Sequence, residues 1–282
     1  MKCERIPLGA QGAYLDTYFL ADSPELKAGA CRPAVVVCPG GGYAYTSDRE
    51  AEPIALALCA RGFHACVLRY PCAPARFPAA LRALAEAVAW VRAGAAENHV
   101  DPRQISVCGF SAGGHLAGSL GVFWNAPFLA AETGLAPQDM RPDKMVLCYP
   151  VITGGEFAHK GSFDNLLGAD ADAARRAEVS LEQHVTQDTP PAFLWHTYTD
   201  PGVPVENTML FDLEKDPEEL ENVAEDPAYG ESLAGLQRRL ADFVLFHSTG
   251  KVYRNRQEPQ LRKQEELDAQ AERMKEFIRE RW

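Results

Sequence analysis

The stretch Gln104-Ile105-Ser106-Val107-Cys108-Gly109-Phe110-Ser111-Ala112-Gly113-Gly114 decides the fold of this chain. Its first five residues predict a strand, and a helix is predicted from about Ala112 to Trp124. Between them, residues 109–113 match the pattern Gly-x-Ser-x-Gly. A strand, a tight turn at a serine and a helix in succession lift the hydroxyl above a sheet edge and aim backbone amides at it. We therefore expect Ser111 to be a nucleophile, the alternative being an ordinary glycine-rich turn.

Strands and helices alternate on both sides of this stretch. Helices are predicted at 52–60 and 78–96, the second with one apolar face. Short apolar runs predict further strands at 34–38, 65–69, 144–148 and 192–196. Such alternation predicts an α/β fold with a mostly parallel sheet and helices on both of its faces. In these sheets ligands bind at the carboxyl ends of the strands.

A glycine loop, Pro39-Gly40-Gly41-Gly42-Tyr43, follows the strand predicted at 34–38. Acyl transfer requires hydrogen-bond donors for the oxygen that becomes negative in the tetrahedral intermediate. Glycines let backbone amides approach the substrate, so we expect the N–H groups of Gly41, Gly42 and Ala112 to form an oxyanion hole. The alternatives are a flexible linker or a phosphate loop, and the Gly-Lys-Ser/Thr of a phosphate loop is absent.

These segments together resemble the esterase/lipase branch of the α/β-hydrolases, which includes hormone-sensitive-lipase-like acetyl esterases and xylan-esterase-like proteins. The resemblance covers roughly residues 30–210 and implies the α/β-hydrolase fold. One departure is Pro39, where many relatives carry histidine, although backbone donors would survive that change. The segments that carry it are 38–43, 47–50, 101–117, 149–152 and 196–205.

The resemblance also implies an acid and a base, in the order serine, acid, histidine. Asp200 matches the acid, which orients the base and stabilises its imidazolium. Of the seven histidines, His247 alone follows Asp200, and its segment does not have the family's Gly-His form. We expect the others to pack, to form hydrogen bonds or to stand out of order: His64, His196 and His115 in core elements, and His99, His159 and His184 before Asp200.

The chain changes character near residues 205–212. Beyond this boundary the sequence is rich in charge and poor in glycine, which predicts a mainly helical C-terminal tail over 212–282 that packs loosely. Residues 210–227 resemble the C-terminal segment of a sulfatase, without a sulfatase nucleophile motif. The hydrolase core, residues 1–211, would then lack its last strand and histidine loop.

Composition excludes several classes of function. A net charge of −11 argues against nucleic-acid binding. No apolar run is long enough for a bilayer and no signal core follows Met1, so we expect a cytoplasmic location and no membrane contact. The eight cysteines show no Cys-x-x-Cys spacing, which favours buried free thiols and no metal site. No cofactor is implied, and the oligomeric state stays open.

The sequence therefore predicts a serine carboxylesterase for short-chain acyl esters, with acetylated carbohydrates as the substrates that the resemblance suggests. Ser111 would attack, Gly41, Gly42 and Ala112 would hold the oxyanion, and Asp200 would orient a histidine. The alternative is a catalytically impaired remnant of the fold that binds a small ligand or a partner, which the absence of a Gly-His loop favours.

Overall fold

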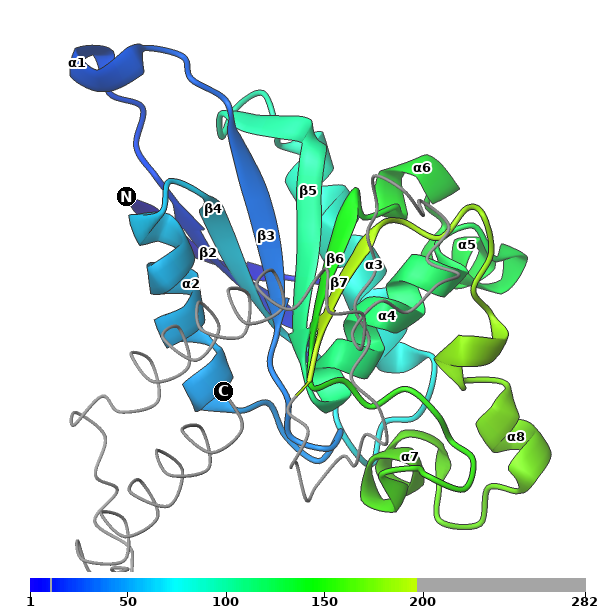
Figure 1. Ribbon diagram of the computed structural model, residues 1–282. Helices are drawn as coiled ribbons and strands as arrows, with labels where there is room; N and C mark the ends of the chain where they lie inside the picture. The colour runs from blue at the N-terminus through cyan, green and yellow to red at the C-terminus, as the bar shows by residue number, and fades with distance from the viewer. Residues whose placement is uncertain (11, 197–282) are drawn as a thin grey trace, which may run out of the picture. The chain divides into compact units, whose positions relative to one another are not determined.

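A computed structural model describes residues 1–196 of the protein, with the exception of residue 11. In this part of the chain, seven strands form one sheet in the order β1-β2-β4-β3-β5-β6-β7 (Figure 1). The strands from β3 to β7 run parallel, and β1 and β2 are antiparallel to their neighbours. The prediction of a mostly parallel α/β sheet is confirmed. The bounds are β1 Lys2–Pro7, β2 Tyr14–Phe19, β3 Arg32–Cys38, β4 His64–Arg69, β5 Val100–Phe110, β6 Lys144–Cys148 and β7 Ala192–Trp195.

The antiparallel hairpin of β1 and β2 is absent from the sequence-based prediction. In β2, Leu15, Thr17 and Phe19 are buried, and the residues between them are half-buried. This alternation is the pattern of a strand with one covered face. β1 is exposed along most of its length, so its sequence carries little of the apolar signal that identifies the central strands.

Helices cover both faces of the sheet, as predicted. α2 (Glu52–Ala60) lies on one face, and α3 (Ala79–Ala93) and α4 (Ala112–Phe123) lie on the other (Figure 1). Two clusters of buried apolar side chains correspond to these two layers. The shorter helices are α1 Pro24–Lys27, α5 Pro127–Thr133, α6 Pro137–Met140, α7 Lys160–Leu167 and α8 Ala173–Ala177, and single 3₁₀ turns lie at Asp48–Glu50 and Leu181–Gln183.

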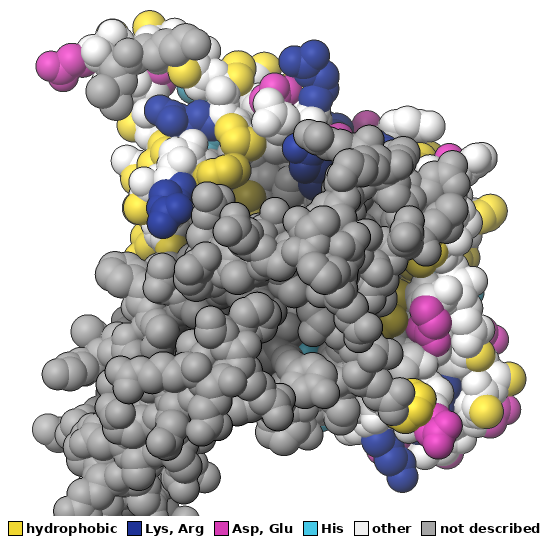
Figure 2. Space-filling model, in the orientation of Figure 1, with side chains coloured by type: hydrophobic (Ala, Val, Ile, Leu, Met, Phe, Trp, Pro, Cys, Tyr) yellow, Lys and Arg dark blue, Asp and Glu magenta, His cyan; other side chains and the backbone are white. Residues whose placement is uncertain are grey.

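One large apolar residue of α2, Leu56, is 44% exposed. In the space-filling view, hydrophobic and basic side chains are mixed on this part of the surface (Figure 2). No helix among residues 1–196 is long and apolar enough to cross a membrane.

The carboxyl ends of four parallel strands meet at one edge of the sheet. Cys38 of β3 pairs with Gly109 of β5, and Phe110 of β5 pairs with Cys148 of β6. Cys148 in turn pairs with Trp195 of β7. β5 leads directly into α4 at this edge, so the fold places Ser111 where parallel sheets bind their ligands.

The cysteine predictions are confirmed in part. Cys38, Cys59, Cys66 and Cys108 are buried free thiols, and burial raises the pKa of the Cys38 and Cys66 thiols well above the usual range. Cys3 and Cys31 are exposed. Several other predictions lie outside the described residues: the boundary at 205–212, the helical tail at 212–282, Asp200 and His247.

Candidate active site

Ser111 occupies a sharp turn between β5 and α4. Its φ is 52° and its ψ is −119°, a conformation that L-residues rarely adopt and that costs on the order of 1–3 kcal/mol. The Ser111 amide donates to the carbonyl oxygen of Cys148 at 3.0 Å, and the Ser111 carbonyl accepts from Val151 at 3.1 Å. The side chain is half-buried, whereas Phe110 and Ala112 on either side of it are buried. The turn therefore presents a partly accessible hydroxyl on a fixed backbone.

The two glycines of the Gly-x-Ser-x-Gly pattern allow close packing that a side chain would prevent. A Cβ on Gly109 would lie 2.1 Å from the Gly113 carbonyl oxygen. A Cβ on Gly113 would lie 2.1 Å from the carbonyl oxygen of Cys38, at the end of β3. The first turn of α4 thus rests directly on the strand that leads into the glycine loop.

The glycine loop lies against the serine turn. A Cβ on Gly40 would lie 2.8 Å from the Phe110 carbonyl oxygen and 3.1 Å from Ser111 Cβ. Gly41 has a φ of 131°, and a Cβ there would lie 2.2 Å from the carbonyl oxygen of Tyr45. The structure therefore brings together the two predicted parts of the site, which are about 70 residues apart in the sequence.

The hydrogen bonds of the loop leave particular amides available. Within the described part of the chain, the amides of Gly41, Gly42 and Ala112 have no acceptor. The loop carbonyls, in contrast, are engaged: those of Gly40, Gly41, Gly42 and Tyr43 accept from Ser47, Ala44, the Asn165 side chain and Ala73. A loop that is anchored through its carbonyls and keeps its amides unused is suited to bind an anion.

Glu50 connects the loop to the neighbouring strand. Its Oε2 accepts from the Gly40 amide at 2.7 Å, and its Oε1 accepts from the Tyr149 hydroxyl at 2.9 Å. Burial and the nearby Glu50 carboxylate raise the pKa of Tyr149 well above its usual value, so this phenol remains a donor. Glu50 thus fixes the first amide of the loop and the residue that follows β6.

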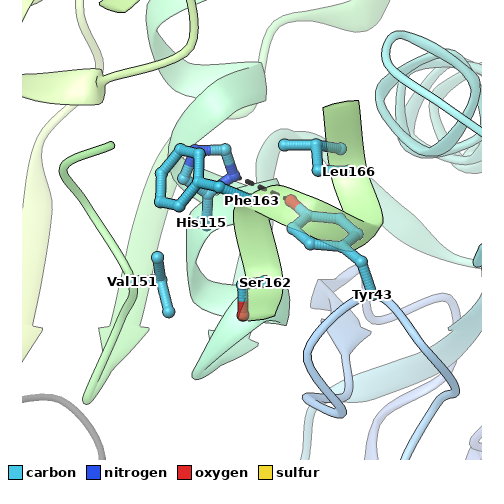
Figure 3. A pocket seen from close by; sticks show the side chains of 6 residues that line it. All are labelled: Tyr43, His115, Val151, Ser162, Phe163 and Leu166. Carbon is cyan, nitrogen blue, oxygen red and sulfur yellow. Dashed lines mark hydrogen bonds between the residues drawn. The ribbon is translucent and has the colours of Figure 1, made fainter. Parts of the chain in front are cut away.

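His115 is buried in α4, one turn after Ser111, and forms hydrogen bonds at both ring nitrogens. Its Nδ1 lies 2.8 Å from the Tyr43 hydroxyl (Figure 3). Its Nε2 lies 2.8 Å from the Val179 carbonyl oxygen. Burial lowers the pKa of His115 to about 4. The prediction that His115 packs and forms hydrogen bonds is confirmed, and so is that for His64, whose Nδ1 accepts from the Leu20 amide at 3.0 Å.

Two further histidines, His159 and His184, have contacts away from Ser111. His159 begins α7, with its Nδ1 2.8 Å from the Ser162 hydroxyl. His184 packs its ring against Phe123 at 4.7 Å between centroids. None of the imidazoles of His64, His99, His115, His159 and His184 forms a hydrogen bond with the Ser111 hydroxyl. No group of three or more metal-ligand side chains occurs within residues 1–196.

Three residues of the site have no role in the sequence-based prediction. Tyr43, Glu50 and Tyr149 occur in the segments that carry the family resemblance, which is the one signal that singles them out. Their partners are distant in the chain: Tyr43 bonds to a residue 72 positions away, and Glu50 to one 99 positions away.

Comparison with known proteins gives a consistent picture. A family model described as BD-FAE matches residues 22–214. The crystal structure of an acetyl ester-xyloside bifunctional hydrolase from Caldicellulosiruptor lactoaceticus is similar, with 32% sequence identity and a TM-score of 0.65, over 86% of this chain and 97% of that one.

Two curated relatives also match. Endo-1,4-beta-xylanase B of Butyrivibrio fibrisolvens is 37% identical over 189 residues, which cover 64% of this chain and 29% of the relative. The acetylxylan esterase of Xylanibacter ruminicola is 29% identical over 197 residues, 66% of this chain and 36% of the relative. The chain thus spans about a third of the length of these relatives. The comparisons do not support the sulfatase resemblance of the tail.

Proposed function

This chain belongs to the BD-FAE family of α/β-hydrolase esterases, and we propose that it is a serine carboxylesterase that hydrolyses short-chain acyl esters, acetylated carbohydrates in particular. The observation that carries the proposal is the contact between the strained Ser111 turn and a glycine loop with unused amides. A nucleophile and donors for a developing negative charge are the two features that acyl transfer requires.

The reaction follows from these positions. Ser111 Oγ attacks the acyl carbonyl carbon and passes its proton to a histidine. The carbonyl oxygen, now negative, accepts hydrogen bonds from the amides of Gly41, Gly42 and Ala112. The histidine returns the proton to the alcohol oxygen, which leaves, and water then cleaves the acyl–Ser111 bond by the same route. Asp200 would orient the histidine, and His247 is the candidate that the family's chain order offers.

An exposed aromatic residue supports carbohydrates as the alcohol part. Tyr45 leaves 58% of its side chain exposed, and its Cδ2 would lie 3.2 Å from a Cβ on Gly41. A tyrosine ring presents an apolar face with a polar tip, which suits the mixed surface of a sugar. The names of the two acetyl-ester relatives are consistent with this substrate class.

The first test is the hydrolysis of p-nitrophenyl acetate by wild-type protein and by Ser111→Ala. We expect turnover that Ser111→Ala reduces by roughly a thousandfold or more. Wild-type turnover equal to that of Ser111→Ala, in protein that is folded by circular dichroism, would favour the alternative, a ligand-binding remnant of the fold.

A second test addresses the base. If His247 is the base, His247→Ala abolishes turnover and Asp200→Ala lowers it strongly. In an impaired enzyme, activated acetate acylates Ser111 once and deacylation stalls, because no base activates water. A single burst of p-nitrophenol without steady turnover identifies that case.

The carbohydrate proposal is tested by Tyr45→Ala. We expect the KM for an acetylated xylo-oligosaccharide to rise about tenfold or more, as fits a lost aromatic contact of about 1.5 kcal/mol. The KM for p-nitrophenyl acetate should stay within twofold, since that ester carries no sugar. Tyr45→Phe keeps the ring and serves as the matched control. An equal change for both esters would argue against a sugar platform.

A further inference from the structure

The amides proposed for the oxyanion hole come from two separate elements. Gly41 and Gly42 belong to the loop that follows β3, and Ala112 begins α4. An oxyanion hole works only when its donors lie about 2.7–3.1 Å from one oxygen position, so the spacing between the two elements has to be fixed. A contact that fixes the spacing between the glycine loop and α4 therefore affects the rate of the reaction.

Tyr43 and His115 form that connection. Among the hydrogen bonds of the described residues, the one from the Tyr43 hydroxyl to His115 Nδ1 joins the glycine loop to α4. The other bonds that anchor the loop run elsewhere, for example from Asn165 of α7 to Gly42 and from the Tyr70 hydroxyl to Pro39. Both partners are buried, with 3% of Tyr43 and 1% of His115 exposed.

The hydrogen bond at the other ring nitrogen of His115 decides which partner donates in the bond between Tyr43 and His115. The Val179 carbonyl oxygen can only accept, so the Nε2 that lies 2.8 Å from it carries the proton. The neutral imidazole then has a lone pair at Nδ1, which accepts from the Tyr43 hydroxyl. The chain of bonds runs from Tyr43 to His115, as Figure 3 shows, and from His115 to the Val179 carbonyl, and each polar atom in it is satisfied.

We infer that His115 is a positioning residue, which acts through Tyr43 to hold the Gly41 and Gly42 amides at a set distance from the Ala112 amide. This inference rests on the proposed esterase function. His115 lies four positions after Ser111, and its own amide donates to the Ser111 carbonyl at 3.1 Å. The same residue is therefore tied to the serine turn through its backbone and to the glycine loop through its side chain.

The first variant that tests the inference is Tyr43→Phe. It removes the hydroxyl and keeps the ring, which packs edge-on against His115 at 5.8 Å and Tyr70 at 5.9 Å. We expect kcat for p-nitrophenyl acetate to fall about 10- to 100-fold, since displaced oxyanion donors lose much of their effect. KM should stay within twofold. Affinity for a trifluoromethyl ketone, whose adduct with the serine carries the oxyanion, should fall in parallel with kcat/KM.

Two substitutions at position 115 separate positioning from stability. His115→Asn keeps a polar group near the position of Nδ1, where Tyr43 can bond to it, and loses the bond to Val179. His115→Gln keeps a polar group near the position of Nε2 and loses the bond to Tyr43. Both should lower the melting temperature, but kcat per active site should fall further in His115→Gln. Active sites are counted by titration with a fluorophosphonate.

Thr17→Val is the matched control, because Thr17 of β2 is another buried hydroxyl that donates to a backbone carbonyl, that of Glu4, and it contacts neither the glycine loop nor α4. Its kcat should equal that of the wild type. The inference is overturned if Tyr43→Phe keeps wild-type kcat, or if the two variants at position 115 lose kcat equally. Wild-type protein that neither turns over acetate nor reacts with the fluorophosphonate defeats the proposed function itself, and the inference with it.

Discussion

Glu50 accepts two hydrogen bonds beside the serine turn, one from the Gly40 amide and one from the Tyr149 hydroxyl. Glu50→Ala leaves both donors without this acceptor, so we predict a loss of about 2–3 kcal/mol in the free energy of unfolding. Glu50→Gln keeps one carbonyl acceptor and should lose less. Urea denaturation measures the change, with Glu132→Ala, at an exposed position of α5, as the control. A loss of unfolding free energy no larger than that of the control would show that the two hydrogen bonds of Glu50 do not stabilise the fold.

His115 makes the stability of the fold depend on pH. Burial lowers its pKa to about 4, while the Val179 carbonyl and the charge of Glu182 oppose that shift, and the ordinary value is 6.5. Between these two pH values the unfolded chain binds a proton that the folded chain excludes. The free energy of unfolding should therefore fall by about 3 kcal/mol as pH drops from 6.5 to 4, with no further loss from this residue below 4.

Urea denaturation at a series of pH values measures this dependence, with His115→Asn as the comparison. The variant starts from a lower stability, but its curve should be flatter across the window because the titrating group is gone. The prediction is wrong if the two curves run parallel from pH 6.5 to 4.

At the scale of elements, the packing of α4 on the end of β3 decides whether the site forms. Gly113→Ala would place a methyl group 2.1 Å from the Cys38 carbonyl and 2.5 Å from that of Pro39. Neither atom belongs to a flexible side chain, so we predict a loss of about 3 kcal/mol in unfolding free energy, with a matching loss of esterase activity. Gly155→Ala, in an exposed loop, is the control and should change little. Wild-type activity in Gly113→Ala would contradict this packing.

Periodicity predicted the strands from β3 to β7 and missed β1 and β2 for a physical reason. β3 and β4 are apolar runs because helices cover them on both faces, and their sequences show it directly. β1 is exposed along most of its length and only one face of β2 is buried, so their sequences carry a weaker apolar signal. The α4 helix was predicted within one residue, since a glycine turn marks its start.

At the scale of the whole molecule, the sequence located the serine and the glycine loop but not what holds them together. Both are local patterns that a turn or a strand end requires. The bonds from Tyr43 to His115 and from Asn165 to Gly42 join residues 72 and 123 positions apart, and only the order of strands in the sheet brings them close. A single sequence carries no local signature of such pairs.

The central claim is that Ser111 is the nucleophile of the folded protein. Its most direct test is to treat the native 282-residue chain with a fluorophosphonate and to locate the adduct by peptide mass spectrometry. We predict one adduct per chain, on the peptide that contains Ser111, and no adduct in Ser111→Ala or in protein unfolded with urea. An adduct on another residue, or equal labelling of native and unfolded chains, would contradict the account.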